Sequence, residues 1–367
     1  MPDFQRLVIP FMIKFFAVYT FLAFHILTLL PQTAFGHTVG IKQERQLVWG
    51  VTFSTDDRYV VTTNQEGVLL VFDTSSCSIQ SLIVPSPIHD NSWERHMLTG
   101  LAWRPGQQEL ATAMRDGTVR LWSIDQRSGD VHEKGIYAVT SSIKNGHSGL
   151  RTVAFSQDGS LLAAAGHGPE VYVWKTEKEG PPIHVLNGQA GTINMVAFGR
   201  DSSVLLSAGD DGMIRFYDLK QEMEVRTIKT QGPILNALVS PDLRYIAVTS
   251  LPNEEATLFD FETGGEVRRL PNAPGTFVWA LAFSPDNRIL ATGLRGEKSQ
   301  IRLFRLDQGR ELWDTVIPSG DWTFSLAFSH SGKYLLAGVY ADGPYLLDSE
   351  TGAILGRYGA GTCSSNN

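Results

Sequence analysis

The sequence contains few cysteines and no excess of positive charge, and each shortage excludes a class of function. Its 367 residues include two cysteines, Cys77 and Cys363, too few for a multi-cysteine zinc site or a disulfide framework. Its 31 lysines and arginines are outnumbered by 38 aspartates and glutamates, which gives a net charge of −7. A chain without excess positive charge is poorly suited to a phosphate backbone, so we expect no nucleic-acid partner.

Charged residues are scarce as well, whereas turn-forming residues are abundant. Charged residues make up 19% of the chain and hydrophobic residues 43%, which excludes a disordered chain and a coiled coil. There are 35 glycines and 17 prolines, and 10% of the residues are aromatic. Many turns between short apolar segments are typical of an all-β protein.

The longest apolar run lies at the N-terminus, over residues 7–30. The small-residue pattern Ala34-Phe35-Gly36 follows it, an order typical of a secretory signal peptide. We therefore predict that residues 1–36 are a signal peptide, cut between Gly36 and His37. The alternative is an uncleaved anchor, because a run of about this length can just span a bilayer. In both cases the remainder is exported, periplasmic or secreted, and only the N-terminal segment would contact a membrane.

Seven segments of the chain share one layout: an apolar run that ends in a large residue, followed by a turn. The spacings between these large residues are 50, 52, 43, 41, 44 and 45. A second and a third apolar run follow each segment, and a fourth run completes the repeat. A period of about 40 to 45 residues with four short strands is typical of a propeller blade. The large residues are Phe53, Trp103, Phe155, Phe198, Val239, Phe283 and Phe328.

The repeats resemble those of the WD40-repeat family over residues 48–358. The third runs that end in Phe72-Asp73, Tyr217-Asp218 and Phe259-Asp260 come nearest to the family's Trp-Asp pair, which no repeat contains. The resemblance implies an all-β, seven-bladed β-propeller. It leaves residues 37–47 as a lead-in strand or linker, and the last blade looks complete from C-terminal residues alone.

The family's buried network of His, Ser or Thr, Asp and Trp has no complete set in this sequence. The second repeat offers Thr112, Asp116 and Trp122. The third has Trp174, but Ala164 occupies its second strand. Because such a network is a structural device, we expect its loss to lower the rigidity of several blades without removing any chemistry.

The two cysteines fall in neighbouring blades, and a disulfide between them would lock the ring in an oxidising compartment. Cys77 lies where a third strand turns into a fourth, whereas Cys363 follows a fourth strand. These positions are expected on opposite faces, about 17–20 Å apart, against the roughly 4.4–6.8 Å that a disulfide allows between Cα atoms. We therefore expect no disulfide unless residues 359–367, expected to be a flexible tail, bridge the gap.

Catalytic and metal-binding signatures are missing from the sequence. His132-Glu133 lacks a second histidine at the zincin spacing. The segment 146–150, Gly-His-Ser-Gly-Leu, misses the nucleophile-elbow pattern at its last residue and precedes a predicted strand. We expect no enzyme, no cofactor and no metal. The alternatives are a propeller that binds a small ligand or glycan, and a propeller enzyme resembling lactonases or quinoproteins.

One position of the repeat, four residues before each large anchor, lies where the inner strand begins at the mouth of the channel. In a closed ring the sixth, seventh and first blades are consecutive, so Trp279, Phe324 and Trp49 are predicted to form one arc. Aromatic residues clustered near the centre of a face are typical of binding hot spots, and equally of packing between blades. Arg151 is the main charged residue at this position.

The longest connection between blades, residues 84–98, is expected on the same face. It is either a second contact surface or a solvated insertion. The sequence thus predicts an exported scaffold in the cell envelope that binds partner proteins through the mouth of its channel. The candidate partner-binding residues are Trp49, Trp279, Phe324, Arg151, Trp93, Arg95 and His96.

Overall fold

The computed structural model describes residues 48–64, 66–84, 97–139, 149–252, 255–272, 275–296, 298–318, 322–340, 343–359 and 362–363. Residues 44–367 form one compact unit. Over the described residues this unit is all strand and turn, and none of them belongs to a helix that could cross a membrane. The predicted signal peptide and the lead-in segment 37–47 lie outside the described residues.

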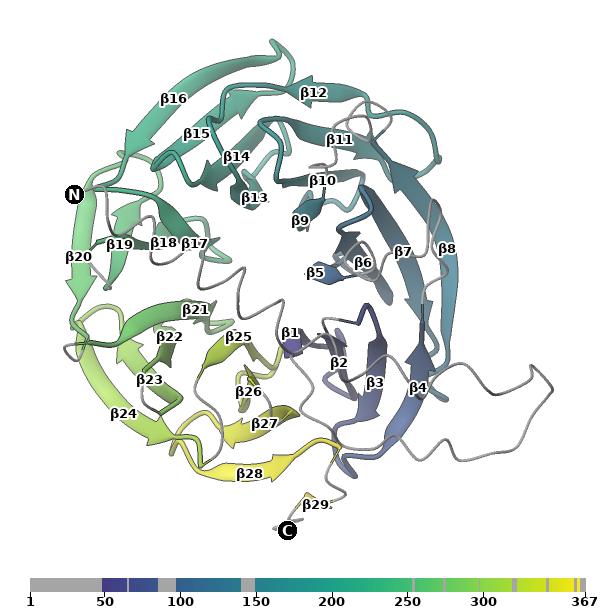
Figure 1. The fold of residues 1–367 in the computed structure, drawn as a ribbon, viewed down its shortest axis with the longest axis vertical. Helices are drawn as coiled ribbons and strands as arrows, with labels where there is room; N and C mark the ends of the chain where they lie inside the picture. Colours follow the sequence, from purple (N-terminus) through teal and green to yellow (C-terminus); the bar gives the residue numbers. More distant parts are fainter. Residues whose placement is uncertain are drawn as a thin grey trace, which may run out of the picture. The chain divides into compact units, whose positions relative to one another are not determined.

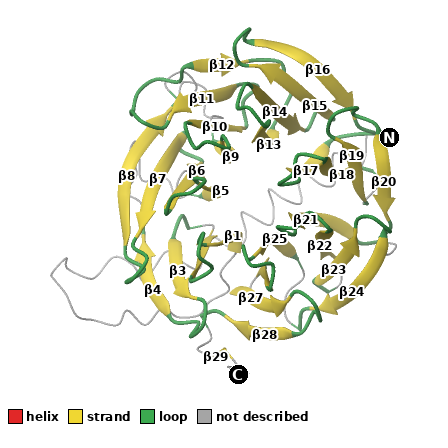
Figure 2. Cartoon of the chain, turned by 180° about the vertical axis from the view of Figure 1, so that it is seen from behind, coloured by secondary structure: helices red, strands yellow, loops and turns green. Residues whose placement is uncertain are grey.

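Seven antiparallel sheets stand around a central axis, each with its first strand innermost and its later strands following in chain order (Figure 1). The predicted seven-bladed β-propeller is confirmed, and Figure 2 shows the same ring from behind. Blades one to three contain β1 (Val48–Phe53), β2 (Tyr59–Asn64), β3 (Leu69–Asp73), β4 (Ile79–Ile83), β5 (Leu98–Trp103), β6 (Glu109–Met114), β7 (Thr118–Ile124), β8 (Val131–Ala138), β9 (Leu150–Phe155), β10 (Leu161–Gly166), β11 (Val171–Lys175) and β12 (His184–Leu186). Blades four and five contain β13 (Ile193–Phe198), β14 (Val204–Gly209), β15 (Met213–Asp218), β16 (Met223–Lys229), β17 (Ile234–Val239), β18 (Tyr245–Ser250), β19 (Ala256–Asp260) and β20 (Glu266–Leu270). Blades six and seven contain β21 (Phe277–Phe283), β22 (Ile289–Arg295), β23 (Gln300–Arg305), β24 (Arg310–Val316), β25 (Thr323–Phe328), β26 (Tyr334–Val339), β27 (Gly343–Asp348), β28 (Ile354–Arg357) and β29 (Thr362–Cys363).

The hydrophobic core lies between neighbouring blades. One cluster joins Ala111 and Tyr137 of blade two to Leu162 and Trp174 of blade three. The second strand of each blade is covered on both faces, so β10 reads as the continuous apolar run Leu161–Gly166. The outermost strands face solvent on one side, so β24 alternates between exposed and half-buried residues.

The turn between the first and second strands explains the recurring Ser-x-Asp of the repeats. In blade three the Ser156 hydroxyl donates to Asp158 Oδ1 at 2.6 Å and accepts the Leu161 N–H at 2.9 Å. The bond from Ser156 is the main reason why the pKa of Asp158 falls to about 2. The same pair of bonds occurs at Ser54, Ser240 and Ser284.

The buried tryptophan network is formed only in part. In blade two, Trp122 Nε1 donates to Thr112 Oγ1 at 2.9 Å, and the Thr118 hydroxyl donates to Asp116 at 2.6 Å. In blade three, Trp174 Nε1 is buried without a hydrogen-bond partner, because an alanine occupies the position that threonine holds in blade two. The sequence predicted this difference between blades two and three.

The outermost strands run along the rim toward the next blade (Figure 1), and several donate hydrogen bonds to carbonyls in its turn between third and fourth strands. Tyr137 of blade two bonds to Thr176 O at 2.9 Å. Arg268 of blade five bonds to Gln308 O at 3.0 Å, and Trp313 of blade six bonds to Ser349 O at 3.1 Å. Neighbouring blades are therefore joined at the rim as well as through their core.

The ring closes by the same contact, between blade seven and blade one. Tyr358, directly after β28, donates to Thr74 O at 3.4 Å, and its ring lies 5.4 Å from that of Phe72. All described strands of the last blade come from the C-terminal end of the chain, as its sequence indicated. No N-terminal strand is needed to complete a four-stranded sheet there.

A disulfide reinforces this junction, and the expectation that none forms was wrong. Cys77 is 2% exposed and disulfide-bonded, and the sequence contains one other cysteine, Cys363. The expectation treated the strands of a blade as parallel to the channel. Because a β-sheet twists, β28 instead runs along the rim to the turn that holds Cys77. β29 then pairs with β28 and sets Cys363 opposite Gly356, where a flexible tail was expected.

We expect the variant Cys77→Ser to be less stable than the wild type by about 2–4 kcal/mol, because the disulfide closes a very long loop and restricts the unfolded chain. Guanidinium unfolding followed by tryptophan fluorescence measures the difference. The fully reduced wild type is the control and should unfold with the variant. Identical midpoints for the oxidised wild type and the variant would contradict the prediction.

Candidate functional site

The mouth of the channel is the face where each second strand ends and where the connections between blades arrive. The residue directly after a second strand is held there by a backbone hydrogen bond to the incoming connection. Arg115 N donates to Met97 O at 3.1 Å, and Tyr340 N donates to Trp322 O at 2.8 Å. His167 and Asp210 are held in the same way, so their backbone positions do not depend on their side chains.

Aromatic side chains gather on one side of the mouth, on blades six, seven and one. The Phe324 ring is 8% exposed, and its centroid lies 4.8 Å from that of Trp49 and 6.1 Å from that of Trp279. Two further rings contact it, Trp322 at 5.4 Å and Tyr340 at 6.1 Å. We call Trp49, Trp279, Trp322, Phe324 and Tyr340 the aromatic arc.

The predicted trio is therefore brought together, and the structure separates its members by burial. Phe324 is buried at the centre of the arc, so it packs, whereas Trp49 and Trp279 are half-buried. Trp322 and Tyr340 were missed because the sequence analysis considered one position per repeat. Tyr340 directly follows a second strand, and aligning that position across the repeats is the signal that would have found it.

The positively charged side chain of Arg295 stacks on one ring of the aromatic arc. The Arg295 guanidinium lies 3.5 Å from the centroid of the Trp322 ring, and the two residues also form a β-bridge. Burial lowers the pKa of Arg295, although the group stays charged. A guanidinium stacked on an indole is a stable cation–π pair and leaves its N–H groups available at its edges.

Charged residues occupy the other side of the mouth, on blades two to four. Arg151 extends from the inner strand β9, where burial lowers the pKa of its guanidinium. The charge of Arg115 lowers it further, and that of Asp210 opposes the shift. Arg115 Nη2 lies 3.3 Å from His167 Nε2. Asp210 accepts a hydrogen bond from Asn194 Nδ2 at 2.8 Å.

Side chains at other positions of the inner strands form hydrogen bonds to the backbone of the next blade. The Thr99 hydroxyl donates to Leu150 O in the next blade at 2.8 Å. Asn194 Nδ2 also donates to Ile234 O at 2.8 Å, and Asn236 Nδ2 donates to Trp279 O at 2.9 Å. The last of these bonds fixes the backbone of an arc residue.

The remaining candidates from the sequence are not placed by the structure. Trp93, Arg95 and His96, in the connection between blades one and two, lie outside the described residues, as do Gly36 and His37 at the predicted cut. Within the described residues, no group of three or more His, Cys, Asp or Glu side chains is arranged to hold a metal ion.

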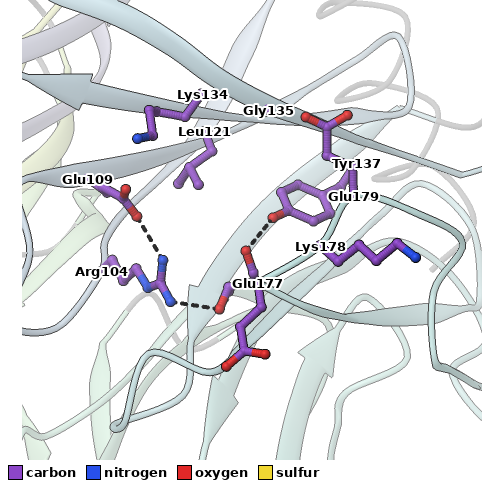
Figure 3. Close-up of a pocket in the computed structure, with 10 residues that line it drawn as sticks. Arg104, Glu109, Leu121, Lys134, Gly135, Tyr137, Glu177, Lys178 and Glu179 are labelled. Carbon is purple, nitrogen blue, oxygen red and sulfur yellow. Dashed lines mark hydrogen bonds and ion pairs between the residues drawn. The ribbon is translucent and has the colours of Figure 1, made fainter.

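A pocket of about 400 Å³ lies between blades two and three, away from the mouth (Figure 3). Its central polar groups already bond to one another. Arg104 donates to Glu109 at 2.8 Å and to the Thr176 hydroxyl at 2.9 Å, and Tyr137 donates to the Thr176 carbonyl. Burial raises the pKa of Tyr137. The pocket is thus a structural junction between two blades.

We expect Phe324→Ala to destabilise the propeller by about 3–5 kcal/mol, since it removes a buried ring. Trp322→Ala should cost clearly less, because this ring is half-exposed and its removal leaves a smaller cavity. Urea unfolding of both variants, with the wild type as reference, measures the difference. Equal losses would mean that the whole arc is core.

Comparison with known proteins finds WD repeats in this chain. The family model "WD domain, G-beta repeat" matches residues 89–123, 137–175, 180–218 and 264–305. The chain is 31% identical over 197 residues to the periodic tryptophan protein 2 homolog of Dictyostelium discoideum, which covers 52% of this chain and 21% of that protein. It is 24% identical over 277 residues to the nuclear distribution protein nudF of Aspergillus niger, a match that covers 68% of this chain and 58% of that protein. It is 26% identical over 243 residues to human WD repeat-containing protein 18, a match that covers 59% of this chain and 52% of that protein. The matched region thus spans about a fifth to three fifths of these relatives.

Proposed function

We propose that this chain, in which WD40 repeats are found, is an exported interaction scaffold of the cell envelope that binds partner proteins through the mouth of its channel. The aromatic arc is the observation that carries this proposal. Radial repetition suits the role, because a propeller presents many loops on one rigid face and leaves few exposed strand edges. We propose a binding platform, not an enzyme.

The arc has the construction of a binding hot spot. Phe324 is buried beneath it and fixes the positions of Trp49, Trp279 and Trp322, which are half-buried at the surface. Tryptophan and tyrosine are enriched in hot spots near the centre of interfaces. Because their rings are already ordered by mutual contact, little side-chain entropy is lost when a partner covers them.

Export is supported by two independent features. The bonded state of Cys77 is typical of oxidising compartments, since cytosolic thiols are kept reduced. The apolar run 7–30 and the small residues that follow it have the layout of a signal peptide. A cut before His37 releases the propeller, whereas an uncleaved segment would hold it at the membrane.

We expect the double variant Trp279→Ala, Trp322→Ala to lose the protein partners that the wild type captures after mild crosslinking of the tagged chain in its own host. The matched control is Met223→Ala, Val225→Ala on β16, where both side chains are 52% exposed on the outer rim. Each variant is first checked by circular dichroism and thermal melting to be fully folded at the temperature of the capture experiment. The captured proteins are then identified by mass spectrometry.

Loss of the same partners from both double variants, or from neither, would contradict binding at the mouth. A wild type that captures no protein, but gains melting temperature with envelope sugars, is a ligand carrier instead.

For export, we expect the mature chain isolated from cells to begin at His37 and both cysteines to react with a maleimide only after reduction. N-terminal sequencing and mass spectrometry measure these two properties. The variant Cys77→Ser is the control, because its single remaining thiol should react without reduction. Thiols of the wild type that react directly in intact cells would contradict an oxidised, exported propeller.

A further inference from the structure

The mouth contains arginines that have no carboxylate partner among the described residues. We call Arg115, Arg151 and Arg295 the mouth arginines. Arg115 contacts Met97 Sδ at 3.5 Å and His167, Arg295 stacks on Trp322, and the Arg151 guanidinium has no hydrogen bond or ion pair within the described part of the chain. All three sit at one face of a chain that has more acidic than basic residues.

Several half-buried arginines elsewhere in the propeller have carboxylate partners, whereas others, such as Arg226 and Arg268 on the rim, donate to backbone carbonyls of the next blade. Arg104 lies 2.8 Å from Glu109, and Arg120 lies 2.7 Å from Glu133. Arg215 lies 2.6 Å from Asp211 and 3.1 Å from Glu224. Burying a guanidinium without a counter-charge costs free energy, and these ion pairs offset that cost. Among the described residues, the mouth arginines have neither a carboxylate partner nor the carbonyl partners of the rim arginines.

The acidic group on the same side of the mouth is not paired with Arg151. Asp210 acts on Arg151 electrostatically, but no ion pair joins the two within the described residues. Its Oδ1 accepts a hydrogen bond from Asn194 instead. Asp211, the next residue, is bound to Arg215. Arg151 thus lies where the inner strand β9 meets the mouth, without an ion pair among the described residues.

We propose, building on the interaction function proposed above, that the mouth arginines bind the carboxylate of a partner peptide, with Arg151 as the main contact and the aromatic arc covering an apolar neighbour of that carboxylate. A guanidinium fork matches a carboxylate in geometry and charge. The arc lies on blades six, seven and one, and Arg151 lies on blade three, so a segment that bridges the channel reaches both. The occupant is an acidic, partly apolar peptide segment.

Three synthetic peptides, titrated by calorimetry against the full-length protein, test this assignment. The first alternates Glu and Leu over six residues and is blocked at both ends. The second has Gln in place of Glu, and the third is the Gln peptide with a free C-terminal carboxylate. We expect the Glu peptide or the free-ended peptide to bind at least tenfold more tightly than the blocked Gln peptide. Tighter binding of the Glu peptide would mean that a side-chain carboxylate is recognised, and tighter binding of the free-ended peptide that the C-terminal carboxylate is recognised.

The variant Arg151→Gln should abolish this preference, whereas Arg310→Gln, at an exposed position of β24 on the outer rim, should keep it. The fold of Arg151→Gln should be retained, because the change removes an unpaired charge, and its melting temperature is measured first. Equal binding of the three peptides, no binding of any of them, or a preference that survives in Arg151→Gln overturns the proposal.

The two proposals fail separately. If partner capture still depends on Trp279 and Trp322 while the carboxylate preference is absent, the scaffold function stands and the anionic ligand is wrong. If capture does not depend on the arc but the carboxylate preference depends on Arg151, the mouth recognises acidic groups without being the partner-binding surface proposed above.

Discussion

The contact between an outermost strand and the following blade is the constraint on which the ring depends. Each blade is a twisted sheet, so its last strand leaves the radial direction and runs along the rim. It arrives at the turn between the third and fourth strands of the next blade, where side chains such as Arg268 and Trp313 donate to free carbonyls. The junction of blades seven and one repeats this contact through Tyr358 and adds the bond at Cys77.

A ring fixed at its rim also fixes the mouth, because every mouth residue follows a strand that cannot shift. In blades two, three, four, five and seven the residue after the second strand is held by a backbone hydrogen bond, so its position does not depend on its side chain. The same repeat position holds Arg115, His167, Asp210, Arg295 and Tyr340. One face can therefore carry a charged side and an aromatic side without any change in the blades beneath it.

The sequence predicted the features that repeat and missed those that depend on twist or on pairing in space. The spacing of residues such as Phe155 and Phe198 was sufficient for seven blades, and one repeat position was sufficient for most of the arc. The bond at Cys77 was missed because strand length alone does not tell where a twisted strand ends. That Arg151 lacks a counter-charge is a property of its neighbours in space, which no spacing along the chain reveals.

The mouth differs from much of the propeller body in how its arginines are compensated, and this difference is the physical argument for its proposed ligand. In the body of the propeller, Arg104, Arg120 and Arg215 have carboxylate partners. At the mouth, Arg151 is half-buried without a carboxylate partner in the described chain. Proteins depart from full satisfaction mainly at functional sites. A carboxylate brought by a partner would compensate the charge, and apolar cover would complete the arc, so both halves of the mouth favour the same kind of occupant.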